Sequence, residues 1–319
     1  MIISASRRTD IPAFYSDWLF NRLKEEFVYV RNPMNIHQIS KIVLSSDVVD
    51  CIVFWTKNPA DMLTRHRADL QNLQIPFYFQ FTVNSYNKLI EPNVPEKKLV
   101  FDTFAELSSL CGKERVIWRY DPIIITETLS ADYHCKYFEY IAKKLAPYTN
   151  KCVMSFVDMY KKTQKNMSGI PCEALTFEGQ IELSKRLLQI ANTYGLELVT
   201  CAEQIDLTNI GIAHGKCVDP ELIAHLCGGT VMLRKDKNQR PECGCVDSID
   251  IGAYNTCLHG CKYCYANFSQ NVVERQSKAH NPLSPLITGE VLPEDRIVVR
   301  DVKSVIDKQA FLFDKGDFV

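Results

Sequence analysis

Three cysteines near the C-terminus are the residues whose type and spacing say most about chemistry. Cys257, Cys261 and Cys264 have the spacing C-x3-C-x2-C, and the aromatic Tyr263 directly precedes the last thiol. Three thiolates on one short loop can hold three irons of a [4Fe-4S] cube, whereas four thiolates would close the cluster. The fourth iron is then open to a ligand. The sequence therefore predicts an iron-sulfur centre that can bind and cleave a small molecule.

The same three cysteines have an alternative interpretation as a structural zinc site. Cys243 or Cys245 could complete such a site to four thiolates. Zinc ribbons usually use paired C-x2-C knuckles, and this spacing is not one. We favour the iron-sulfur interpretation, which makes the segment an active site, whereas zinc would only stabilise the fold.

Further cysteines could form a second metal site. Cys243 and Cys245 stand one residue apart in the run PECGCVDS, and Cys201 and Cys217 lie upstream at an expected strand end and in a loop. These four thiolates could bind an auxiliary [4Fe-4S] cluster or a zinc ion, and Cys227 could replace one of them. Alternatively, the upstream cysteines are simply small buried hydrophobes.

Composition limits the class of protein. The chain has 319 residues, of which 46% are hydrophobic, so it can bury a large core. No run approaches the roughly 18 to 20 apolar residues that a membrane span needs, and the first residues lack the basic region of a signal peptide. The 13 cysteines then favour reduced thiols and metal over disulfides. We expect a cytoplasmic protein without a membrane partner, and the net charge of -1 gives no overall basic surface for nucleic acid.

Short apolar segments alternate with amphipathic ones along most of the chain. Runs rich in β-branched and aromatic residues predict strands at 2–6, 51–56, 76–83, 115–120, 152–157 and 196–201. Amphipathic stretches between most of them predict helices at 17–26, 98–111, 130–145 and 176–194. Near-continuous apolar strands separated by helices are typical of a parallel sheet covered on both faces. The sequence therefore predicts an α/β fold, a full or partial parallel (β/α) barrel of the TIM type.

Polar residues follow nearly every expected strand. One such residue alone is more often a turn former or a helix cap, but parallel strands end at one rim, where barrel enzymes place their chemistry. Arg7 and Arg8 follow the first strand, and Arg119 lies at the end of the fourth. These arginines could clamp a phosphate or a carboxylate through paired hydrogen bonds. A nucleotide or another phosphate-bearing substrate is therefore a hypothesis.

The cysteine motif, its aromatic included, resembles the signature of the radical S-adenosylmethionine (SAM) superfamily. The runs SASRRTDIP at 4–12 and FWTKNP at 54–59 are similar to the spore-photoproduct-lyase-like branch of that superfamily. The chain as a whole resembles an uncharacterised bacterial domain-of-unknown-function family. The superfamily resemblance implies that the open iron binds the amino and carboxylate groups of SAM. An electron from a donor such as flavodoxin or ferredoxin would then split the sulfonium and give a 5'-deoxyadenosyl radical.

The resemblance also implies where SAM would bind. We expect it to lie over the cluster against the strand-end residues Arg7, Thr9, Asp10 and Lys57. Tyr263 would either stack on the adenine or separate the cluster from water, and dry surroundings tune its reduction potential in both cases.

The order of the segments differs from that of radical SAM proteins, whose cysteine loop follows the first barrel strand. Here the loop follows at least six strand-helix units, although residues 246–254 could form a strand directly before it. A barrel cut after its first unit, with that unit moved to the C-terminus, would restore the order, and such circular permutation is physically tolerable. We expect barrel units at 1–240, a cysteine-rich iron-sulfur segment that completes the barrel at 241–268, and a C-terminal extension at 269–319.

Two functions follow from these patterns. The favoured one is a radical SAM enzyme that acts on an unknown substrate. The alternative is a non-catalytic protein in which zinc or a closed cluster stabilises the fold, while the basic rim binds a nucleic acid or a protein partner. Metal content distinguishes the two.

Overall fold

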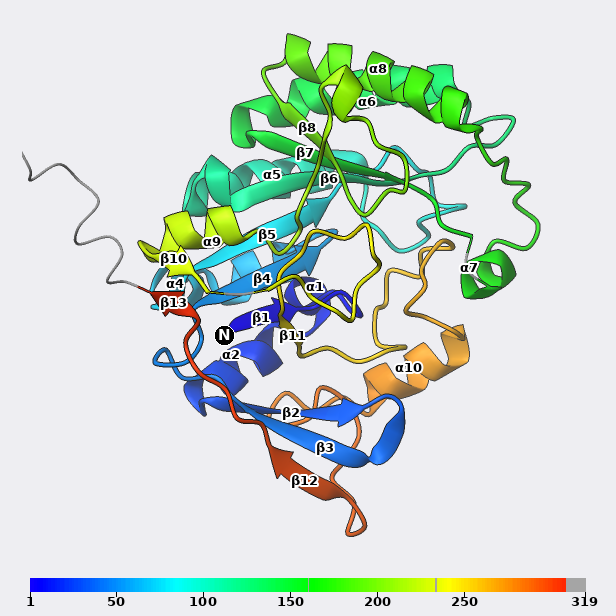
Figure 1. The fold of residues 1–319 in the computed structure, drawn as a ribbon. Helices are drawn as coiled ribbons and strands as arrows, with labels where there is room; N and C mark the ends of the chain where they lie inside the picture. The colour runs from blue at the N-terminus through cyan, green and yellow to red at the C-terminus, as the bar shows by residue number, and fades with distance from the viewer. Residues whose placement is uncertain (160, 233, 308–319) are drawn as a thin grey trace, which may run out of the picture.

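The structure is a computed structural model that describes residues 1–159, 161–232 and 234–307. An eight-stranded sheet runs through its centre (Figure 1), and every neighbouring pair of strands in this sheet is parallel. In spatial order the strands are β11 (Ile249–Asp250), β1 (Ile2–Ala5), β4 (Cys51–Thr56), β5 (Phe77–Thr82), β6 (Val116–Ile123), β7 (Lys151–Phe156), β8 (Glu197–Thr200) and β9 (Ala213–His214). Within the described residues no ladder joins β9 to β11, so the sheet is open at both edges. The predicted α/β class is confirmed.

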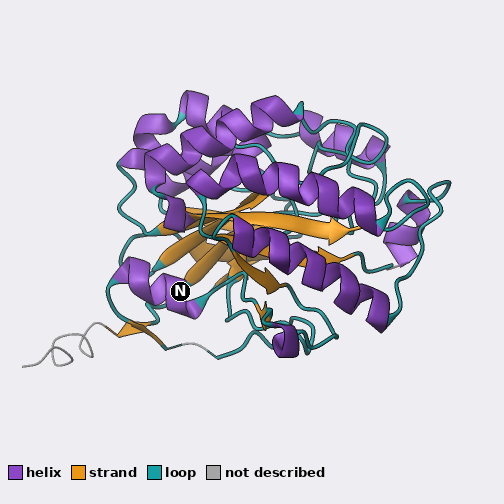
Figure 2. Ribbon diagram, turned by 90° about the horizontal axis from the view of Figure 1, so that it is seen from above, coloured by secondary structure: helices purple, strands orange, loops and turns teal. Residues whose placement is uncertain are grey.

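Helices follow the strands and cover one face of the sheet, as Figure 2 shows. Helix α6 packs between α5 and α8. The helices of the described chain are α1 (Ile11–Phe14), α2 (Ser16–Lys24), α3 (Ala60–Arg65), α4 (Arg67–Gln71), α5 (Lys97–Cys111), α6 (Ala131–Leu145), α7 (Lys161–Asn166), α8 (Phe177–Thr193), α9 (Pro220–Cys227) and α10 (Gln270–Lys278). None of them is long and apolar enough to cross a membrane.

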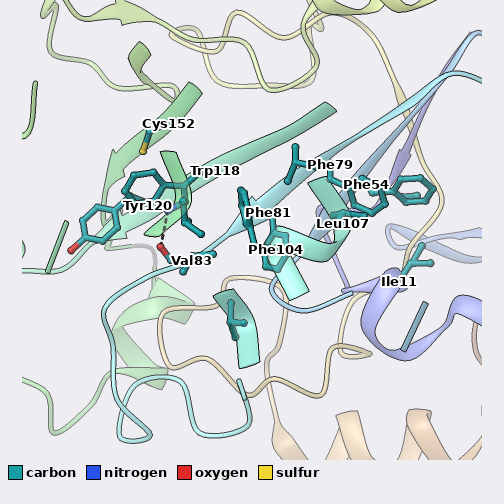
Figure 3. Packing of buried hydrophobic residues seen from close by; sticks show 14 of the residues in the cluster. Ile11, Phe54, Phe79, Phe81, Val83, Phe104, Leu107, Trp118, Tyr120 and Cys152 are labelled. Carbon is teal, nitrogen blue, oxygen red and sulfur yellow. Dashed lines mark hydrogen bonds between the residues drawn. The ribbon is translucent and has the colours of Figure 1, made fainter. Parts of the chain in front are cut away.

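The strands of the large sheet are mostly apolar because both faces of the sheet are buried. Toward α5 and α6, the rings of Phe54, Phe79 and Trp118 pack in the larger core, where the Trp118 indole Nε1 donates to the Val83 carbonyl at 3.0 Å (Figure 3). On the opposite face, Val53 and its neighbours pack against the segment 213–246, which includes α9. This second layer is largely loop, so the alternation of strand and helix did not predict it.

The six strands and four helices predicted between residues 2 and 201 lie within three residues of the observed ones at each end. At two helix starts the agreement has a clear cause. Ser130 caps α6 by accepting from Tyr133 N, and Thr176 caps α8 by accepting from Gly179 N, both at 3.2 Å. The strand predicted at 246–254 was too long, since only Ile249–Asp250 pairs with β1. The backbone turns after Asp250, whose carboxylate accepts from Gly252 N at 3.0 Å.

Two smaller sheets were not predicted. In one, β2 (Phe27–Asn32) and β3 (Asn35–Val43) form an antiparallel pair, and β12 (Arg296–Val299) lies parallel to β3. In the other, β10 (Thr230–Val231) pairs with β13 (Ile306–Asp307). The expected extension at 269–319 therefore contains α10, β12 and β13 as far as residue 307, and its last part, 308–319, lies outside the described residues.

A buried histidine between β6 and α6 should make stability depend on pH. His134 Nδ1 lies 2.8 Å from the Tyr120 hydroxyl and Nε2 lies 2.9 Å from the Ile124 carbonyl, and burial lowers the pKa of His134 from 6.5 to about 4. Below pH 6.5 the unfolded chain binds a proton that the folded protein excludes. This residue should therefore remove about 3 kcal/mol of unfolding free energy as the pH falls from 6.5 to 4.

Denaturant unfolding of wild type and of His134→Gln tests this prediction. Glutamine can donate to the carbonyl and accept from the hydroxyl, but it does not titrate. The difference in unfolding free energy between the two proteins should therefore shrink as the pH falls from 7 to 4. Parallel curves across this range would contradict the prediction.

Candidate functional site

One cavity of about 700 Å³ lies at the carboxyl ends of the parallel strands. Its size is within the range of roughly 300 to 1,000 Å³ that is usual for ligand sites. The cavity is lined by residues that are more than 200 positions apart in the sequence. All the predicted site residues are among them: Arg7, Thr9, Asp10, Lys57, Cys201, Cys217, Cys243, Cys245, Cys257, Cys261, Tyr263 and Cys264.

The cysteine loop directly follows β11 and is held by hydrogen bonds to its backbone. The Tyr15 hydroxyl donates to Thr256 O at 2.6 Å, and the Asn93 side-chain amide donates to Leu258 O at 2.7 Å. Gly260 has a φ of +66°, and a Cβ there would lie 3.3 Å from the Asn93 amide, so a side chain would strain this close approach. The loop is therefore fixed by residues from outside the cysteine motif.

The three thiols of this loop, Cys257, Cys261 and Cys264, face one cavity and influence one another. Cys261 is buried, and Cys257 and Cys264 are half-buried. Burial raises the pKa of all three, and the neighbouring thiols raise that of Cys257 further. Among the described residues, no three His, Cys, Asp or Glu side chains converge on a position for a single metal ion. Thiolates that each bind a different iron of one cluster need not converge on one point, so this finding bears on a single metal ion and not on a cluster.

Asp10 joins three parts of the site. Its Oδ1 accepts from Ala13 N at 3.0 Å and so caps α1, while its Oδ2 accepts from Lys57 N at 2.7 Å. The same Oδ2 lies 2.8 Å from His259 Nε2, within the cysteine loop. Protein donors therefore engage both oxygens of the carboxylate, which positions the loop against the ends of β1 and β4. The sequence predicted Asp10 as a SAM ligand and did not predict this contact.

Lys57 and Tyr263 meet at a carboxylate that the sequence analysis missed. Glu91 accepts from Lys57 Nζ at 2.8 Å, from Lys97 Nζ at 2.9 Å and from the Tyr263 hydroxyl at 2.5 Å. Burial alone would raise the pKa of Glu91, but the two lysines lower it to about 2. The only sequence signal was the long segment 83–96 between β5 and α5, since loops of that length are usually functional.

Four buried polar atoms of residues that line the cavity have no hydrogen-bond partner within the described residues. These are Arg7 Nη2, Thr9 Oγ1, Thr163 Oγ1 and His259 Nδ1, and the first two lie at the end of β1. The Arg7 guanidinium lies over the Trp55 ring, 5.1 Å from its centroid. An unsatisfied buried donor or acceptor costs about 1 to 3 kcal/mol, so these atoms mark where a polar ligand would bind.

Asp250, at the end of β11, fixes the backbone that carries Arg7. It accepts from Ser4 Oγ at 3.2 Å, from Ser6 Oγ at 2.6 Å and from Arg7 N at 2.8 Å. A Cβ at Gly252 would lie 2.1 Å from Ser6 Oγ, so only glycine fits beside this cluster. Sequence analysis missed Asp250, because its partners lie at the other end of the chain.

The three arginines that were predicted to clamp an anion all line the cavity, but they make different contacts. Arg119 is paired with Asp121, whose other oxygen accepts from Ser155 Oγ. Arg8 lies over the Tyr254 ring, 5.1 Å from its centroid, with its Nε 3.9 Å from Asp250. Of the three arginines, Arg7 is the one with a buried donor lacking a partner in the described chain.

The second group of cysteines is also brought together. Cys201 Sγ and Cys217 Sγ lie 3.2 Å apart, and the backbone N–H groups of Cys217 and Val218 donate to Cys245 Sγ at 3.2 and 3.3 Å. Hydrogen bonds from the Cys217 and Cys243 thiols hold the pKa of Cys245 well below its ordinary value. The group thus gathers Cys201, Cys217, Cys243 and Cys245 in the wall of the cavity.

Cys227 was wrongly considered as a replacement ligand. Its Sγ lies 3.3 Å from the carbonyl of Asp50, directly before β4, and so at the amino ends of the strands. It faces away from the cavity because α9 runs back along the sheet toward that end.

Comparison with known proteins identifies the family. Residues 2–266 match the family described as "Domain of unknown function (DUF1848)". The chain belongs to this family. This confirms the predicted membership of a domain-of-unknown-function family, and the matched range includes every predicted site residue.

Other comparisons add little. No curated protein matches the DUF1848 chain. Among solved structures, a putative alpha-L-fucosidase from Bacteroides thetaiotaomicron VPI-5482 is similar over 56% of this chain and 74% of its own, with 11% identity and a TM-score of 0.26. A likeness this low carries no argument about fold or function.

Proposed function

We propose that this protein is a radical SAM enzyme in which Cys257, Cys261 and Cys264 hold a [4Fe-4S] cluster. The observation that carries the proposal is the shared cavity, in which three thiols of one rigid loop lie with the unsatisfied donors and acceptors at the end of β1. When bound, the cluster would supply the electron that splits SAM and yields a 5'-deoxyadenosyl radical.

The position of β11 supports a circularly permuted partial barrel. This strand is the last of the large sheet in sequence, yet it pairs with β1, the first. The cysteine loop leaves β11 as a loop would leave the first strand of a barrel, and β1 then takes the second place. A circular permutation would therefore account for the inverted order of the sequence.

Each site residue has a distinct role in this proposal. Arg7 and Thr9 offer free polar groups to the carboxylate or hydroxyl groups of SAM. Asp10 and His259 act as positioning residues, because they fix the cysteine loop to β1 and β4. Tyr263, whose hydroxyl is bound by Glu91, forms a wall that excludes water from the thiols.

Anaerobic purification followed by metal analysis tests the proposal. The protein should be brown, with about 4 irons per chain for one cube or about 8 for two. After reduction it should give an EPR signal that changes when SAM is added, and 5'-deoxyadenosine should form. Samples without reductant are the control. Colourless protein that holds zinc and yields no 5'-deoxyadenosine would overturn the proposal and favour the non-catalytic alternative.

A further inference from the structure

Four cysteines from three separate segments meet in the layer that covers the second face of the sheet. Cys201 directly follows β8, Cys217 lies between β9 and α9, and Cys243 and Cys245 lie in the loop before β11. The last three are buried and the first is half-buried, and all four line the cavity. Because these segments are distant in sequence, their thiols are gathered by the tertiary fold.

We propose that Cys201, Cys217, Cys243 and Cys245 together bind a second metal centre, which is thiophilic and closed by four thiolates. The ligand class is zinc or an iron-sulfur cluster, the two centres that four cysteine thiolates hold in proteins. This inference does not depend on the proposed function, since the cysteine loop contributes no ligand to it.

The arginines around these thiols supply the charge that such a centre needs. Arg119 Nη1 lies 2.7 Å from Cys217 Sγ, and the Arg7 and Arg119 guanidinium groups lie 5.3 Å or less from the centroid of the Trp55 ring. Within the described residues no carboxylate oxygen lies within ion-pair distance of Arg7. A divalent metal with four thiolates has a net charge of about -2, which nearby guanidinium groups would partly balance. Arg119 also pairs with Asp121, so Arg7 is the arginine whose charge such a centre would compensate.

Metal binding would change the contacts that the thiols now make. Cys201 and Cys217 contact each other, and no three ligand side chains of the described chain surround one point. A metal would replace these hydrogen bonds by metal–sulfur bonds and release the thiol protons. The backbone N–H groups of Cys217 and Val218 already donate to Cys245 Sγ and could keep these hydrogen bonds to a metal-bound sulfur.

A closed centre would stabilise the cavity wall. With all four positions occupied by cysteine, no coordination site is left for a substrate. The centre would instead connect the end of β8 to the segment 213–246, which covers one face of the sheet. Loss of the metal should therefore weaken the packing of this segment against the sheet.

Metal analysis of paired variants tests this inference. The Cys243→Ser/Cys245→Ser variant should lose about one zinc, or about two to four irons, per chain relative to wild type. The matched control, Cys111→Ala/Cys172→Ala, removes two cysteines that do not line the cavity and should retain all the metal. A variant that lacks the three thiols of the cysteine loop should keep this second metal. The metal content of the second centre and that of the cysteine loop can therefore be measured independently of each other. Equal metal content in wild type and in the Cys243/Cys245 variant would overturn the inference.

If the variant does not fold, thiol labelling of the wild-type protein provides an independent test. Alkylation under native conditions, with and without a chelator, can be mapped by mass spectrometry. Chelation should increase the labelling of Cys201, Cys217, Cys243 and Cys245 by at least several-fold. Labelling of these four that is unchanged by chelator would count against the centre.

Discussion

Replacement of Cys257, Cys261 and Cys264 by alanine is expected to abolish formation of 5'-deoxyadenosine and to remove about 4 irons per chain. Changes to residues that merely orient metal ligands typically cost about 10- to 100-fold in metal affinity or activity, so loss of the ligands themselves should cost more than 100-fold. Iron analysis and product formation with SAM and reductant, measured on the same preparations, provide the readout.

A matched control separates this effect from the general removal of thiols. Cys111, Cys135 and Cys172 lie outside the cavity, on or near helices, so their joint replacement by alanine should leave iron and activity close to wild type. If the variant of the cysteine loop kept its iron and still cleaved SAM, the assignment of the three thiols as cluster ligands would be wrong.

The elements of the large sheet were predictable because burial on both faces leaves a strong pattern in the sequence. Strands such as Cys51–Thr56 are apolar at nearly every position, and their bounds were predicted to within three residues. The rim was predictable for a related reason. Parallel strands with their crossover helices must all end on one side, so Arg7, Lys57 and Cys201 had to approach one another.

The contacts that fix the site were not predictable, because they join residues far apart in the chain. Asp250 binds the start of the chain, and Glu91 binds residues 57 and 263. Neither carboxylate belongs to a motif, so only the folded chain shows what it contacts. The pairing of β3 with β12 was missed for the same reason, since residues 38 and 296 become neighbours only through the tertiary fold.

Replacement of Glu91 by glutamine is expected to destabilise the protein by about 3 to 5 kcal/mol, the usual cost of removing one partner from a buried ion pair. Glu91 is almost fully buried, and the side chain of Lys57 is 14% exposed. Glutamine would leave the Lys57 ammonium without a counter-charge, whereas Lys97, whose side chain is 30% exposed, can turn toward solvent. Denaturant unfolding of the variant at pH 7 measures the loss.

A double-mutant cycle isolates the pair from the rest of the network. Lys57→Met/Glu91→Gln removes the unpaired charge and should recover most of the stability that Glu91→Gln alone loses, because replacing both members of a buried pair is far less costly than breaking it. Tyr263→Phe is a matched control, since it removes one hydrogen bond to Glu91 and leaves both charges in place. It should cost only about 1 to 3 kcal/mol. Additive effects of the Lys57 and Glu91 changes would show that the two side chains do not stabilise each other, and Lys57 would then need another source of charge compensation near the cysteine loop.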